Sequence, residues 1–160
     1  MKLGYFLYYN GGINMAQFIK DNINLPVSLH DSVITSMQQN SSASYKMDGH
    51  IILKFTDGFY IVNKKELEKT GESYILLSGV DFDFSHIYYF KENKREKITF
   101  NQLEEDIENY TICVINEMYG YNQTKFSCSM NKKNELYEVE IEIYHFNKTR
   151  YEWVYKPIHI

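Results

Sequence analysis

The sequence predicts an α+β protein dominated by antiparallel β-sheet, a meander of hairpins with two short helices. It contains 15 Tyr and 10 Phe among 160 residues but only two Ala. Aromatic and β-branched side chains suit the pleated surface of a strand, whereas Ala favours helix. A chain of this length is expected to form a single domain, with residues 1–97 and 98–160 as its candidate sub-units.

The clearest strand lies at residues 137–143, where Tyr, Val and Ile alternate with glutamates. A period of two places the apolar side chains on one face and Glu138, Glu140 and Glu142 on the other. Aromatic residues alternate again at 151–155, after a short turn. We therefore expect these two runs to form a hairpin and to close a four-strand meander.

Other strands are predicted wherever aromatic and β-branched residues cluster between turn signals. Asp57-Gly58 is the strongest of these signals, because this dipeptide fits the turn of a tight hairpin. Residues 111–119 are more continuously apolar than the alternating runs, which predicts a central strand covered on both faces. The remaining strands are expected at residues 33–38, 44–47, 51–55, 59–62, 74–77, 82–90 and 125–130.

Helical signals are few. Thr99 and Gln102 fit a capping box, and Leu103 and Ile107 follow at helical spacing. Residues 15–23 also carry apolar side chains at helical spacing, after two glycines and before a proline. The sequence therefore predicts one helix at each of these places.

Composition excludes several classes of function. Acidic side chains number 21 against 17 basic ones, and the formal net charge is -4. The densest basic groups, at 64–65 and 91–97, fall in expected turns, so nucleic-acid binding is not predicted. No apolar run approaches the roughly 20 residues of a membrane helix, and the start lacks a secretory signal. We expect a cytoplasmic protein without a cofactor, whose two cysteines, Cys113 and Cys128, are free thiols.

Two short polar segments are candidate sites. His30 and Asp31 lie in a loop that leads into a strand, where they either bind a ligand or simply form a turn. Asp81 and Asp83 would share one face of a strand, and with His86 they could hold a metal ion or act as acid and base. The alternative interpretation is that Asp81 and Asp83 belong to a solvated polar face, while His86 lies on the opposite face. That face is aromatic, and we expect its rings to point toward the core: Phe82, Phe84, Tyr88 and Phe90.

The segment from Leu29 to Ile34, followed by the strand at 51–55 and its hairpin, resembles small bacterial proteins encoded beside polymorphic-toxin genes. Such proteins are taken to be immunity proteins. The resemblance covers residues 25–62. The resemblance implies a β-rich cytoplasmic protein that binds one protein partner, and it implies no catalytic residues.

Three hypotheses for function follow. The first is a non-catalytic binding or inhibitor protein, whose glutamates at 138, 140 and 142 meet a basic toxin and whose Tyr-rich surface contributes contact area. The second is a small metal-dependent hydrolase that uses the Asp and His residues above. The third is a small-molecule binder with an aromatic-lined cup formed by Phe82, Phe84, Tyr88 and Trp153. The sequence leaves open whether the protein forms a homo-oligomer.

Overall fold

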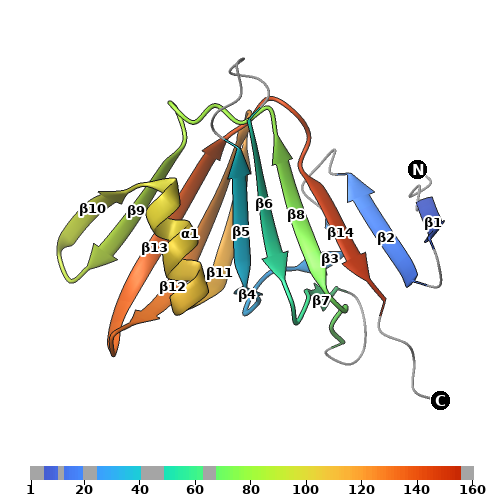
Figure 1. The fold of residues 1–160 in the computed structure, drawn as a ribbon, viewed down its shortest axis with the longest axis horizontal. Coiled ribbons are helices and arrows are strands. Elements are labelled where there is room, and N and C mark those ends of the chain that lie inside the picture. The colour runs from blue at the N-terminus through green and yellow to red at the C-terminus, as the bar shows by residue number, and fades with distance from the viewer. Residues whose placement is uncertain (1–5, 11–12, 20–24, 41–48, 63–67, 156–160) are drawn as a thin grey trace.

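The computed structural model describes residues 6–10, 13–19, 25–40, 49–62 and 68–155. Two six-stranded antiparallel sheets and one helix, α1 (Phe100–Asn109), form most of it (Figure 1). Sheet I has the order β1 (Phe6–Asn10), β2 (Ile13–Ile19), β14 (Arg150–Val154), β8 (Ser73–Ser78), β6 (His50–Phe55) and β5 (Ser36–Asn40). Sheet II has the order β10 (Lys94–Ile98), β9 (His86–Lys91), β13 (Glu135–Tyr144), β12 (Gln123–Lys132), β11 (Thr111–Gly120) and β4 (Val33–Ile34). A two-stranded sheet pairs β3 (Val27–Ser28) with β7 (Tyr60–Ile61).

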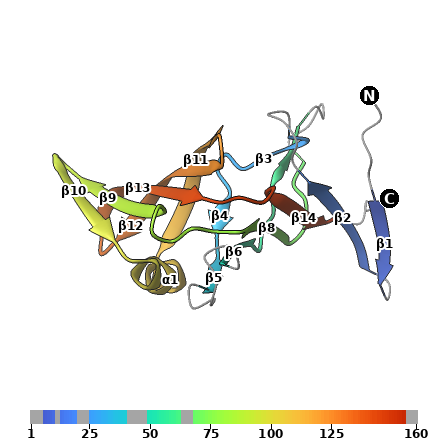
Figure 2. The ribbon, with the colours of Figure 1, turned by 90° about the horizontal axis from the view of Figure 1, so that it is seen from above.

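The core lies between the inner faces of the two sheets. Alternate side chains of β6 and β8 are buried, as are those of β12 and β13, as period-two alternation requires. In Figures 1 and 2, α1 and the β5 edge of sheet I lie next to each other on one side of sheet II. The outer faces of both sheets therefore point away from the core.

The predicted strand at 33–38 is two strands that belong to different sheets. Thr35 separates them: its backbone N–H donates to the Lys54 carbonyl at 2.8 Å. Before it, β4 pairs with β11 in sheet II, and after it, β5 pairs with β6 in sheet I. A continuous apolar pattern cannot reveal this exchange, because both halves bury the same kind of side chain.

The predicted hairpin between 137–143 and 151–155 is wrong. β13 stays in sheet II, but the chain crosses after it and β14 joins sheet I between β2 and β8. His145 lies at the crossing, where its Nδ1 donates to the Asn147 carbonyl at 2.7 Å and its Nε2 accepts from Thr124 at 2.8 Å. These two hydrogen bonds fix the path of the chain from sheet II to sheet I, which the alternation of side chains in the sequence does not predict.

The Asp57-Gly58 turn forms, but not the hairpin expected around it. Gly58 has φ +74°, and its N–H donates to the Phe55 carbonyl at 3.1 Å. β7 then pairs with β3 instead of folding back on β6. Burial of Phe59 beneath sheet I redirects the chain, since its ring packs 4.9 Å from that of Phe55.

The second predicted helix is also wrong. The part of it that the structure describes is β2, which lies between β1 and β14 and pairs with both. Backbone pairing on two sides outweighs the helical spacing of a few apolar residues. The sequence signal that was missed is the dipeptide Gly11-Gly12, which is typical of hairpin turns.

Two further strands differ from expectation. β11 is not central, because only Ile112 and Cys113 pair with β4 and several side chains near its end are exposed. β9 begins at His86, since residues 82–84 form a turn. The strand expected at 44–47 lies outside the described residues.

Helix α1 confirms the predicted cap and apolar stripe. The Thr99 hydroxyl accepts from the Gln102 N–H at 3.1 Å, and Leu103 and Ile107 are buried. The acidic face contributes one buried carboxylate, Asp106, which accepts from Tyr89 and from Lys132 of sheet II. No helix among the described residues has the length and apolarity needed to cross a membrane.

Asp106 is expected to hold α1 on sheet II. It accepts from the Tyr89 hydroxyl at 2.9 Å and from Lys132 Nζ at 2.8 and 3.0 Å. Asp106→Ala would leave both donors without their acceptor and should lower the free energy of unfolding by about 3 kcal/mol in urea denaturation. The matched control is Glu108→Ala on the exposed side of the helix, with a change within about 0.5 kcal/mol. Equal effects of the two variants would contradict this role.

His145 should make stability depend on pH. Burial lowers the pKa of its imidazole, against a smaller opposing effect of the bond to Asn147. The unfolded chain, with an ordinary pKa of about 6.5, therefore binds this proton more readily than the folded protein. The contribution of the neutral His145 side chain to the free energy of unfolding is therefore complete above about pH 6.5 and is lost as the pH falls below that value. Urea denaturation at a series of pH values should show a shallower acid-side loss for His145→Gln, and equal slopes would contradict the prediction.

Candidate functional site

An aromatic column lies on the outer face of β9. Ile87 and Tyr89 point into the core, so His86, Tyr88 and Phe90 point outward and are half-buried. Their rings follow one another at centroid separations of 6.0 and 6.5 Å. The expectation that Tyr88 and Phe90 belong to the core face is therefore wrong, because the strand alternates in the opposite phase.

The three glutamates of β13 stand beside this column. The register pairs Glu138 with Phe90, Glu140 with Tyr88 and Glu142 with His86. Val139 and Ile141 between them are fully buried, as the alternation predicted. These six residues, His86, Tyr88, Phe90, Glu138, Glu140 and Glu142, form what we call the aromatic–carboxylate face.

One lysine neutralises part of this face. Lys125 Nζ lies 2.9 Å from Glu140 Oε2 and 3.2 Å from Glu142 Oε1. Partial burial acts to lower the pKa of Lys125, but the hydrogen bonds to the two carboxylates outweigh it and raise that pKa above its ordinary value. Glu138, at the other end of the row, is exposed. Glu138 is therefore the carboxylate of this row that a partner can reach most readily.

The face already accommodates a cation of its own chain. The Arg95 guanidinium, from the neighbouring strand β10, lies 3.6 Å above the centre of the Tyr88 ring and 5.6 Å from that of Phe90. Such stacking is favourable because the ring face carries negative electrostatic potential. Sequence reasoning missed Arg95, because it placed the basic run at 91–97 in a turn, whereas only its tip is one.

Exposed aromatic rings extend the face at one end. Phe84 and Phe146 flank Tyr144, with ring centroids 6.0 and 5.4 Å from it. Phe84 is 64% exposed and Phe146 is 42% exposed. Apolar rings gathered at the surface are typical of contact surfaces.

His30 and Asp31 lie elsewhere, in a tight turn against the bulge of β11. Asp31 has φ +60°, and its N–H donates to the Val114 carbonyl at 2.9 Å. His30 Nδ1 lies 2.7 Å from the carbonyl oxygen of Ile115, the extra residue of the bulge. Nε2 of His30 lies 3.5 Å from Asp31 Oδ2. This arrangement serves to join the turn to the irregular part of β11.

Asp81 and Asp83 do not share a strand face with His86. Asp81 is buried in a turn, where its Oδ1 accepts from the Asp83 N–H at 3.0 Å, while Asp83 is exposed. Within the described ranges, no three His, Cys, Asp or Glu residues lie close enough together to hold a metal ion. Asp81 thus closes the turn that leads into β9.

The other predicted groupings are separate as well. Cys113 and Cys128 are free thiols, as expected. Trp153 is buried on the inner face of sheet I, whereas Tyr88 lies on the outer face of sheet II, so the two rings do not share a cup.

A substitution series at Asp31 would test the turn. Its left-handed backbone suits Gly, whereas a β-branched side chain would meet the following carbonyl at a cost of about 1–2 kcal/mol. We expect Asp31→Gly to keep the free energy of unfolding and Asp31→Val to lower it by about that amount, measured by urea denaturation. Equal stability of the two variants would contradict the observed turn.

No protein-family model, curated protein or solved structure matches this chain. What the protein does must therefore be inferred from the chemistry of its own surfaces. The aromatic–carboxylate face is the surface that brings together four of the candidate residues, His86, Glu138, Glu140 and Glu142.

Proposed function

We propose that the protein is a non-catalytic binding protein that docks one protein partner on the aromatic–carboxylate face of sheet II. The observation that carries this proposal is the register of β9 and β13, which sets an aromatic column beside a carboxylate column on an outward face. Aromatic rings contribute large contact areas with few rotatable bonds, and interfaces are enriched in them. The exposed rings of Phe84 and Phe146 enlarge the same surface.

The partner we propose is basic, in keeping with an inhibitor of a toxin. Glu138 is exposed beside Phe90, so a lysine or arginine of the partner could contact the carboxylate and the ring together. The stacking of Arg95 on Tyr88 provides a precedent for this contact within the chain. The net charge of -4 would also speed encounter with a basic protein.

An immunity role is the specific form of this proposal. It requires that the partner be a toxin and that binding suppress toxicity. The resemblance of residues 29–34 and of the strand that follows supports it.

The test uses the wild-type protein as bait in lysate of its own cells, followed by affinity measurement with the captured partner. Phe90→Ala removes a ring and should weaken binding about 30-fold, the effect of a strong interface residue. Glu138→Lys should weaken binding and reduce its dependence on salt, because the partner's cation loses its acceptor.

Glu108→Lys is the matched control. It makes the same charge change on an exposed position of α1, away from the outer face of sheet II. We expect it to leave affinity unchanged. If Glu138→Lys and Phe90→Ala bind like the control, this face is not the interface. If the captured protein does not impair growth when expressed alone, the immunity role is overturned while the binding role stands.

A further inference from the structure

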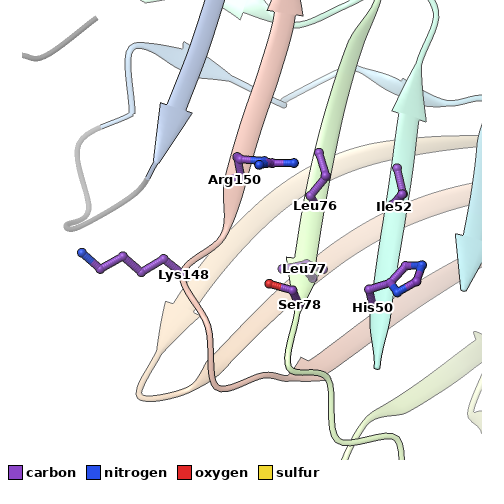
Figure 3. Close-up of a pocket in the computed structure, with 7 residues that line it drawn as sticks. All are labelled: His50, Ile52, Leu76, Leu77, Ser78, Lys148 and Arg150. Carbon is purple, nitrogen blue, oxygen red and sulfur yellow. The ribbon is translucent and has the colours of Figure 1, made fainter. Parts of the chain in front are cut away.

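A second surface lies on the outer face of sheet I, which is turned away from sheet II. It contains a hollow of about 290 Å³ between β6, β8 and the start of β14 (Figure 3). This volume is near the lower end of small-molecule sites. The lining residues are His50, Ile52, Leu76, Leu77, Ser78, Lys148 and Arg150.

The register explains why the sheet is hollowed here. Ile52, Leu76 and Arg150 occupy one row across three strands, and His50 pairs with Ser78 in the next row. Ser78 is the smallest side chain of this group, so the surface drops between its larger neighbours. The hollow is thus produced by one small residue in an ordered array of long ones.

Apart from Ser78, the hollow is lined by two kinds of side chain, apolar and basic. Ile52 and Leu76 are apolar although they point outward, where a solvated sheet face usually carries polar side chains. Every ionisable group that lines the hollow is basic, and no carboxylate lines it among the described residues. An apolar wall with basic groups around it matches a molecule that combines an apolar body with an anionic head.

Arg150 is the group best placed to hold such a head. In Figure 3 its guanidinium reaches from β14 toward Leu76, whereas the Lys148 amine points away from the hollow. Glu152 contacts Arg150 through Nε at 3.1 Å, which orients the guanidinium. A guanidinium has five N–H donors, so a contact at Nε leaves those of the two terminal nitrogens for an anion.

We propose that this hollow is a binding site for a small organic anion, a carboxylate or phosphate monoester with an apolar body. The anionic oxygens contact Arg150 and the Ser78 hydroxyl, and the apolar part lies on Ile52 and Leu76. Lys148 and His50 add basic character at the rim. The site is independent of the proposed protein interface, which lies on the other sheet.

The test is titration of the ¹⁵N-labelled protein with benzoate and phenyl phosphate, followed by the amide shifts of residues 52, 76 and 78. Benzyl alcohol provides the neutral counterpart. We expect at least one of the anions to shift these amides saturably and to bind about tenfold or more tightly than the alcohol. Which anion binds more tightly distinguishes a carboxylate site from a phosphate site.

Two variants locate the site. Arg150→Gln removes the cation and should weaken anion binding about tenfold or more, whereas Ser78→Leu fills the hollow and should abolish binding. Arg95→Gln, on sheet II, makes the same change elsewhere and should leave binding intact. Preserved spectral dispersion shows that each variant is folded. The proposal is overturned if neither anion binds, if the alcohol binds equally well, or if Arg150→Gln behaves like Arg95→Gln.

Discussion

The crossing of the chain at His145 is the constraint on which the architecture depends. It carries β14 out of sheet II and inserts it between β2 and β8. The pairing of β14 with β2 is what connects the β1–β2 pair to the rest of sheet I. A buried imidazole with both nitrogens hydrogen-bonded occupies the crossing, and the buried side chains of the two sheets form one core.

A second exchange lies at Thr35, where the chain also passes from sheet II to sheet I. β4 leaves the N-terminal half to pair with β11, while β5 remains in sheet I. Each sheet therefore contains strands from both halves of the chain. The two outer faces are left free of further layers in the described part of the molecule, and they differ in chemistry. That of sheet II sets rings beside carboxylates, and that of sheet I contains a hollow with an apolar wall and basic groups around it.

Local pattern predicted those features that depend on neighbours in the sequence. The alternation in β12 and β13, the cap at Thr99 and the turn at Gly58 all formed as expected, because each is determined by side chains within a few residues. The candidate site was predicted only in part. Glu138, Glu140 and Glu142 were assigned to an outward face, but the rings beside them were assigned to the core.

The missing information is which strand lies next to which. Backbone hydrogen bonds are the same for every sequence, so alternation indicates that a strand has two faces without naming its neighbour. The sequence by itself determined the strand-rich class, the helix that Thr99 caps and the outward glutamates. Only the tertiary structure decided that β14 pairs with β2 and β8 instead of β13, that Phe90 stands beside Glu138 and that Arg150 lies in line with Leu76. The reason is that register arises from packing between residues that are distant in the chain.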